Sequence, residues 1–303
     1  MSSYVEKMAM NILVIGVGSI GTRHWYNLLS LGHEVQTYDI KSGQPFSPSI
    51  AVRLDGVVIS TPPDSHLKYM QWAADRGLPF LVEKPLSDSL DGLEGLIYRA
   101  REVPALVGYQ LRHLTTLVAA KRELEKLGKI YSARAEFGQF LPDWRPNQDY
   151  RQSYTARLGI ILDASHEIDY LRWLLGEVVQ VSCFAGKLSS LEVKCEDTAD
   201  ILLRFVSGAI ASLHVDFIQK TYVRYCHILG ENGILIWDYT RGLQLQVNEH
   251  SFVVPTEHLD PYKLEMTHFI NCIRGIEQPK VTIQDGFETL KVALEARRQG
   301  WIN

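Results

Sequence analysis

The stretch ILVIGVGSIG, residues 12–21, decides the fold of the first part of the chain. Four apolar residues, typical of a buried parallel strand, run into a GxGxxG turn, and a helical pattern follows from Ile20 to Leu31. The first glycine permits a tight turn, the second lets the backbone approach a pyrophosphate, and the third allows close helix–strand packing. The helix N-terminus offers free N–H groups to the anion. The motif predicts a dinucleotide-binding unit, and the alternative is a glycine-rich helix cap without a ligand.

The predicted cofactor site extends from this turn to the ends of the neighbouring strands. Asp39 ends the next strand, where a carboxylate can hold a ribose 2′-hydroxyl and repel a 2′-phosphate. NAD is therefore favoured over NADP, and Lys41 and Ser42 nearby weaken that preference. Because the carboxyl ends of parallel strands border the ligand crevice, polar residues after two later strands are included. The candidate cofactor-binding residues are Gly16, Gly18, Ser19, Ile20, Gly21, Asp39, Ser60, Thr61, Pro62, His66, Glu83 and Lys84. For His66 the alternative is an ordinary residue of the first helical turn.

The chain divides into two parts by its pattern of strands and helices. Up to about residue 110, short apolar strands alternate with helical segments, which is typical of a doubly wound parallel sheet. After about residue 115, strands follow one another without helices between them, which indicates an antiparallel or mixed sheet. We expect an α/β Rossmann domain over residues 1–115 and an α+β domain with a large open mixed or antiparallel sheet over residues 116–303. The second domain is expected to bind substrate and to mediate oligomerisation.

Composition excludes several classes of function. The 303 residues carry a formal net charge of -4 without a Lys/Arg cluster, which argues against nucleic-acid or anionic-membrane surfaces. No stretch is long enough to span a bilayer, and the leader MSSYVEKMAMN has no apolar h-region. Four scattered cysteines without CxxC spacing predict free buried thiols in a reducing compartment. We expect a cytoplasmic protein that binds neither nucleic acid nor membrane.

A lysine at the end of an apolar strand is the first candidate for chemistry. The run FLVEKP, residues 80–85, delivers Glu83 and Lys84 to the edge of the predicted crevice. Partial desolvation there pulls down the pKa of a lysine and makes it a usable proton donor or acceptor, whereas Glu83 opposes that shift. The alternative is an exposed lysine at the end of a strand.

The segment LDASHEIDYLRW, residues 162–173, contains a second candidate group. On a helix, Asp163, His166 and Tyr170 lie at i, i+3 and i+7, on one face. His166 could exchange a proton with a substrate hydroxyl, and Asp163 could orient it. The alternatives are an N-cap aspartate and a satisfied interior histidine. No metal is expected, because neither HExxH nor a second clustered histidine is present.

The segments GVGSIGTRHWYNL, STPPDSH, VEKP, GYQLRH and LDASHEIDYLRWLLG together resemble the glucose–fructose oxidoreductase / inositol dehydrogenase / MocA family, across essentially the whole chain. This resemblance implies a Rossmann domain before a larger open-sheet domain, and action of Lys84 and His166 around a substrate carbinol or carbonyl. It also implies a cis Lys84–Pro85 bond. The chain departs from the family pattern in two ways, and both concern the role of Asp163 more than that of His166. A single glycine, Gly159, precedes the aspartate where the family has a pair or triplet, and the spacing from aspartate to histidine is three residues instead of four. The form SHEIDYLRWLLG after LPDWRPNQDYR resembles a subgroup associated with bacterial surface-sugar biosynthesis.

A polar, aromatic loop after residue 141 has the chemistry of a sugar site. Its aromatic rings offer stacking faces and its arginines offer hydrogen bonds. The alternative is a solvent loop with ordinary surface arginines. Gln110 and Arg112 of the segment GYQLRH, just past the last Rossmann strand, are added to this loop. The candidate substrate-binding residues are therefore Gln110, Arg112, Trp144, Arg145, Tyr150 and Arg151.

The predicted function is that of an NAD(P)-dependent oxidoreductase with catalytic residues Lys84, His166 and Asp163. Hydride would move between nicotinamide and a hydroxyl-bearing carbon of a sugar, sugar acid or nucleotide-linked sugar. One alternative is a hydrolase or epimerase that retains NAD and uses transient oxidation. The other is a non-catalytic dinucleotide- or sugar-sensing protein. A homodimer or homotetramer is expected, since a strand-rich second domain can bury its sheet in a symmetric contact.

Overall fold

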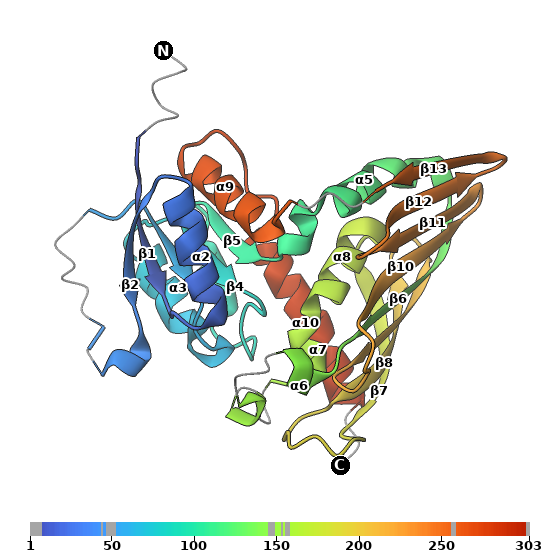
Figure 1. Ribbon diagram of the computed structural model, residues 1–303, viewed down its shortest axis with the longest axis horizontal. Helices are drawn as coiled ribbons and strands as arrows, with labels where there is room; N and C mark the ends of the chain where they lie inside the picture. The colour runs from blue at the N-terminus through green and yellow to red at the C-terminus, as the bar shows by residue number, and fades with distance from the viewer. Residues whose placement is uncertain are drawn as a thin grey trace. The chain divides into compact units, whose positions relative to one another are not determined.

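The computed structural model describes residues 8–43, 45–46, 53–144, 149–152, 154, 158–255 and 259–300. The chain forms two compact units, each with its own sheet (Figure 1). Met1–His113 and Leu259–Phe287 make the first unit, and Leu114–His258 and Glu288–Asn303 make the second. This division differs from the predicted second domain over residues 116–303, because one internal segment returns to the first unit.

The first unit contains the predicted parallel Rossmann sheet. Its five strands run in the order β2-β1-β3-β4-β5, and all four pairings are parallel. The strands are β1 (Asn11–Ile15), β2 (Glu34–Tyr38), β3 (Gly56–Ile59), β4 (Phe80–Glu83) and β5 (Ala105–Gly108). Every residue of β3, β4 and β5 is buried, which explains their near-continuous apolar sequences. The strand order reverses at β1, so the glycine turn after β1 lies at the topological switch point, where such sheets bind ligands.

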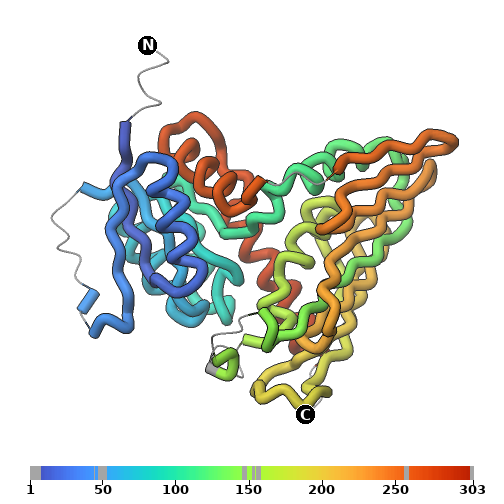
Figure 2. Tube along the Cα trace, in the orientation of Figure 1, coloured from blue at the N-terminus to red at the C-terminus, as the bar shows by residue number. Residues whose placement is uncertain are grey.

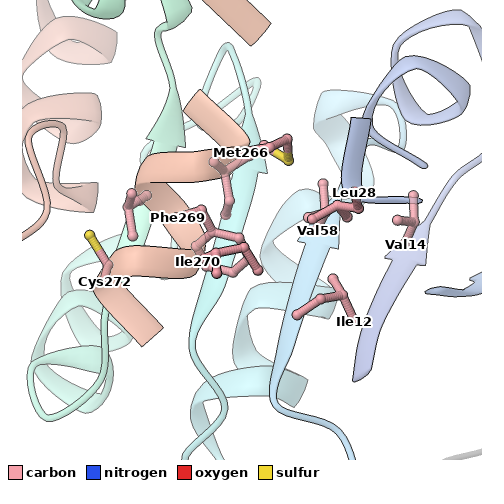
Figure 3. Packing of buried hydrophobic residues seen from close by; sticks show 10 residues of the cluster. Ile12, Val14, Leu28, Val58, Met266, Phe269, Ile270 and Cys272 are labelled. Atoms are coloured by element: carbon pink, nitrogen blue, oxygen red, sulfur yellow. The ribbon is translucent and has the colours of Figure 1, made fainter. Parts of the chain in front are cut away.

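Helix α9 explains why a late segment belongs to the first unit. In Figure 3, Met266, Phe269 and Ile270 of this helix pack with Ile12, Leu28 and other apolar side chains of the sheet and of α2. The tube in Figure 2 shows the orange segment of α9 beside the blue segment of α2. The helices of this unit are α2 (Ser19–Ser30), η1 (Ile40–Ser42), η2 (Pro63–Ser65), α3 (His66–Ala74), α4 (Leu93–Ala100), η3 (Gln110–His113) and α9 (Pro261–Ile273). Helix α10 (Ile283–Gly300) begins in the first unit and ends in the second.

The second unit is built on an eight-stranded mixed sheet in the order β13-β12-β11-β10-β6-β9-β8-β7. Only the central pair β6–β9 is parallel among the pairings of its described strands. The strands are β6 (Ile130–Gly138), β7 (Val178–Gly186), β8 (Thr198–Phe205), β9 (Ile210–Asp216), β10 (Val223–Gly230), β11 (Gly233–Asp238), β12 (Gly242–Val247) and β13 (His250–Val254). The prediction of an open mixed sheet is confirmed.

Helices cover one face of this sheet (Figure 1). The helices of this unit are α5 (Thr115–Glu123), η4 (Leu124–Leu127), α6 (Leu141–Trp144), η5 (Tyr150–Gln152), α7 (Ile160–Asp163), α8 (Ser165–Leu175) and the end of α10. On the other face, Phe184, Leu202 and Ile210 are 76%, 60% and 52% exposed. The strands alternate between buried and exposed residues accordingly. In the described part of the chain, no helix combines the length and apolar character that crossing a membrane requires.

Candidate cofactor and substrate sites

The glycine turn has the geometry of a phosphate-binding turn. Gly16 has φ 89°, and a Cβ there would lie 2.7 Å from the Ser60 carbonyl oxygen. A Cβ on Gly21 would lie 1.9 Å from the Gly16 carbonyl oxygen. A Cβ on Gly18 would meet no atom of the described residues within 4 Å, and Gly18 is exposed. Packing therefore requires the first and third glycines, while the second borders open space that a pyrophosphate can approach.

Asp39 lies beside this turn. The Gly16 N–H donates to the Tyr38 carbonyl at 2.7 Å, so the end of β2 adjoins the first glycine. The Asp39 carboxylate follows directly and accepts from the Lys41 N–H at 2.9 Å. This position agrees with the predicted ribose contact. Among the other candidates at this edge, Ser19 and Pro62 are exposed and Ile20 and Lys84 are half-buried.

Two residues predicted to face the cofactor have structural roles instead. The Ser60 hydroxyl donates to the Gly16 carbonyl at 2.8 Å and thereby holds the glycine turn. His66 is fully buried, with Nε2 2.7 Å from the Thr61 carbonyl and Nδ1 3.1 Å from the Pro85 carbonyl. Burial lowers the pKa of His66 below its usual value. Because both ring nitrogens face backbone oxygens, the structure favours the alternative in which His66 binds no cofactor.

The end of β4 shows why an apolar strand leads into Glu83 and Lys84. Glu83 is 6% exposed, and its Oε1 lies 2.6 Å from Nε2 of the buried His24. Its Oε2 accepts a hydrogen bond from the Lys84 N–H at 3.2 Å. The Lys84–Pro85 peptide bond is cis, as the family resemblance implies. The acidic side chain is thus tolerated in the interior by a specific partner, and the lysine emerges half-buried at the strand end.

One group in the described part of the chain has the composition of a metal site. Ligand-type atoms of His24, Glu83 and Glu265 all lie within 4.8 Å of one another, and all three residues are buried. Sequence spacing did not reveal it, because each member comes from a different element. Its chemistry is taken up below.

The helix expected to carry Asp163, His166 and Tyr170 on one face is broken. Helix α7 ends at Asp163 and α8 begins at Ser165, with Ala164 at φ -84° and ψ 24° between them. Asp163 is not the N-cap of α8 either, because Ala164 holds that position and no side chain caps the helix by a hydrogen bond. Instead, Asp163 accepts a hydrogen bond from the Tyr154 hydroxyl at 2.7 Å. The break therefore corrects both the shared-face prediction and the N-cap alternative.

The first turns of α8 place ionisable side chains in the interior of the second unit. His166 is 5% exposed, and Glu167 and Tyr170 are fully buried. The Glu167 carboxylate pairs with Arg224 Nε at 2.8 Å, and the Arg224 guanidinium lies 4.3 Å from the Phe137 ring centroid. Burial raises the pKa of Tyr170 well above its usual value. Sequence analysis did not identify Arg224, which is four strands away from the helix in the chain.

A single glycine before Asp163 has a packing reason. A Cβ on Gly159 would lie 2.1 Å from the Glu196 carboxyl carbon. Glu196 is fully buried and pairs with Arg297 Nε at 3.2 Å. Burial raises the pKa of Glu196 above its usual value. The chain therefore keeps a glycine at the position where a buried carboxyl group covers the backbone.

The predicted sugar loop is only partly supported. Trp144 ends α6 half-buried, and its ring contacts the Phe137 ring edge-to-face with centroids 5.7 Å apart. Arg151 Nε donates to Asp149 at 2.7 Å, and its NH1 donates to Glu192 at 2.7 Å. These two acidic partners offset the charge of Arg151 at the surface. They favour the alternative in which Arg151 is an ordinary arginine of a solvent-exposed loop. Tyr150 is half-buried, and Arg145 lies outside the described residues.

Gln110 and Arg112, predicted to contact substrate, are buried structural residues. Each is 5% exposed. Gln110 Nε2 donates to the Tyr262 hydroxyl at 3.0 Å, and an Arg112 NH2 group lies 3.7 Å from the Asp285 carboxylate. Both side chains tie η3 to the returning segment 259–287 of the same unit, which the sequence pattern did not reveal.

Comparisons with known proteins agree with this architecture. A model of the GFO/IDH/MocA C-terminal domain matches residues 117–236. Inositol 2-dehydrogenase 2 of Paenarthrobacter aurescens (strain TC1) is 26% identical over 314 residues, 94% of each chain. The scyllo-inositol 2-dehydrogenase (NAD(+)) of Bacillus subtilis (strain 168) is 28% identical over 265 residues, 80% of this chain and 74% of the relative. An oxidoreductase structure from Agrobacterium radiobacter in complex with NAD+, L-tartaric acid and magnesium has a TM-score of 0.83 at 19% identity, over 96% of both chains.

A parallel sheet with a glycine turn, followed by a large mixed sheet, defines a Rossmann-type protein with a second sheet domain. Residues 117–236 thus match a GFO/IDH/MocA C-terminal domain, and the whole chain is similar to inositol 2-dehydrogenases, which supports the resemblance found in its motifs.

Proposed function

We propose that this protein is an NAD(P)-dependent dehydrogenase or reductase that acts on a CH–OH carbon of a sugar, sugar acid or nucleotide-linked sugar. The glycine turn carries the proposal, because two of its glycines are required by packing while Gly18 borders open space beside Asp39. Two relatives are named as inositol 2-dehydrogenases, one of them with NAD(+) in its name. NAD is the proposed cofactor, with NADP as the alternative.

The cofactor supplies the hydride chemistry when bound. We assign Lys84 and His166 to the substrate oxygen: one exchanges the hydroxyl proton and the other polarises the oxygen. Asp163, which accepts a hydrogen bond from Tyr154, is proposed as the third member of the set. Trp144 and Tyr150 remain proposed as sugar-stacking residues.

Gly18→Ala tests the proposal without disturbing the free protein. Its new methyl group meets no described atom within 4 Å, so the melting temperature should stay unchanged, while the methyl group blocks the approach of a pyrophosphate. In a fluorescence titration we expect NADH affinity to fall by about tenfold or more, roughly 1.4 kcal/mol. Gly95→Ala, also with no described atom within 4 Å, is the matched control and should bind NADH normally. Equal NADH affinity in the wild type and Gly18→Ala would contradict the assigned cofactor site.

A screen of sugars, sugar acids and inositols with NAD then tests the reaction. Net NADH formation supports a dehydrogenase, whereas substrate conversion without net NADH change supports the NAD-retaining hydrolase or epimerase. NADH binding without conversion of any bound sugar supports the sensing protein. The cytoplasmic location and the homodimer or homotetramer remain predictions, to be tested by fractionation and light scattering.

A further inference from the structure

Three buried ionisable side chains meet inside the first unit. His24 comes from α2, Glu83 from the end of β4 and Glu265 from α9, and their exposed fractions are 0%, 6% and 1%. Helix α9 is fixed on the unit by the apolar residues next to Glu265, among them Met266 and Phe269 (Figure 3). We call these three residues the buried triad.

Contacts on three sides hold the Glu83 carboxylate. Its Oε1 lies 2.6 Å from His24 Nε2, and its Oε2 accepts the Lys84 N–H at 3.2 Å. On the neighbouring strand, Gly108 pairs with Glu83, and a Cβ there would lie 3.2 Å from the carboxyl carbon. The carboxylate therefore fits against bare backbone and joins His24 to the main chain of Lys84.

Glu265 completes the triad from the side of α9. Neither of its carboxyl oxygens has a hydrogen-bond partner among the described residues. Burial raises the pKa of Glu265 well above its usual value, and the charges of Glu83 and Asp260 raise it further. Glu83, unlike Glu265, has hydrogen-bonding groups at both of its carboxyl oxygens.

A hydrogen-bonded triad fits the geometry better than a metal site. Two ligands of one tetrahedral zinc, each about 2.0–2.1 Å from the ion, lie roughly 3.3 Å apart. The 2.6 Å between His24 Nε2 and Glu83 Oε1 is instead the length of a short hydrogen bond.

We propose that His24 and Glu265 are positioning residues for Lys84. His24 holds the Glu83 carboxylate through the 2.6 Å contact, and Glu265, with a carboxyl oxygen within 4.8 Å of both ligand-type atoms, confines that carboxylate to the orientation in which it accepts the Lys84 N–H. The proposal rests on the proposed function in one respect, the assignment of Lys84 to the reaction. The triad binds the backbone N–H of Lys84 and thereby sets the direction in which the lysine side chain leaves the strand. The triad residues themselves do not contact substrate in this proposal.

Matched pairs of variants test the proposal. His24→Gln keeps an N–H donor near the position of Nε2, and His24→Phe removes it. Glu265→Gln keeps a neutral polar group, and Glu265→Leu removes it. We expect kcat to fall about 10- to 100-fold in the Phe and Leu variants with little change in the KM for NAD, and the Gln variants to recover most of the loss.

A second readout does not depend on turnover. In protein labelled with 15N-lysine, the Lys84 amide resonance should move in His24→Phe and Glu265→Leu and return toward the wild-type position in the Gln variants. His33→Gln is the control, because His33 is a buried histidine of the same unit that instead accepts the Met10 N–H at 3.2 Å. It should leave the Lys84 resonance in place.

An unmoved Lys84 resonance in both apolar variants would overturn the positioning role, as would equal kcat losses in the Gln and apolar variants. If the wild type turns over no sugar with NAD, the proposed function fails and the resonance alone decides the positioning role. If an apolar variant does not fold, His24→Asn and Glu265→Asp replace it. Each withdraws its polar group by roughly one bond length, about 1.5 Å.

Discussion

Replacing Arg224 by methionine should destabilise the second unit by several kcal/mol. The guanidinium is 2.8 Å from Glu167, and the two side chains are 11% and 0% exposed. At an effective dielectric constant of about 20, the attraction at this distance is roughly 6 kcal/mol, part of which offsets desolvation. Methionine keeps an apolar stem over Phe137 but leaves the buried Glu167 without this cation. We therefore expect a cost of about 3–5 kcal/mol.

A double-mutant cycle measured by urea unfolding checks this reasoning. The combination of Glu167→Leu with Arg224→Met removes both charges, and its cost should be well below the sum of the single costs, by about 2 kcal/mol or more. Additive single costs, or a cost below about 1 kcal/mol for Arg224→Met, would refute a strongly coupled buried pair.

Three further predictions concern separate regions of the chain. Gly21→Ala should lower the unfolding free energy by about 1–3 kcal/mol in urea titrations, since its methyl group would lie 1.9 Å from the Gly16 carbonyl oxygen. The hydrogen bond to Asp216 raises the pKa of His214 from 6.5 to about 9, so its stabilisation is complete below pH 6.5 and is lost as the pH rises through about 9. His214→Gln should flatten that decline in the unfolding midpoint. Phe184→Asp, on the open sheet face, should reduce the mass found by light scattering to that of one chain; an unchanged mass would exclude this face as the oligomer contact.

Local pattern predicted the strands well where burial is regular. Strands β3, β7 and β8 coincide with apolar or alternating stretches of the sequence, at 56–59, 178–186 and 198–205. Strand β13 was missed because its residues are almost all exposed, so no alternation of apolar and polar residues marks it. The break at Ala164 was missed for a related reason: nothing in an apolar-periodic segment shows that one residue leaves the helical conformation.

Contacts between distant segments limited the prediction of the site. His24 lies three residues after Gly21 on the buried face of α2, so its inward direction was readable from helical spacing. Its pairing with Glu83 depends on the contact between α2 and the end of β4, which sequence spacing does not show. Glu265 offered no such signal, because its place depends on the return of α9 to the first unit. The same return gives Gln110 and Arg112 buried partners, and their contact with substrate stays a prediction.

The discontinuous first unit has a consequence for synthesis on the ribosome. The part of this unit that holds its sheet strands ends at residue 113, whereas its last segment ends at residue 287. A further 174 residues must therefore be synthesised before the unit is complete. At about 5–20 residues per second, this takes roughly 9–35 s. Until α9 (Pro261–Ile273) has been synthesised, the apolar surface that later receives Phe269 and Ile270 is without its helix. The first unit is therefore expected to expose apolar surface during synthesis until this late segment of the chain completes it.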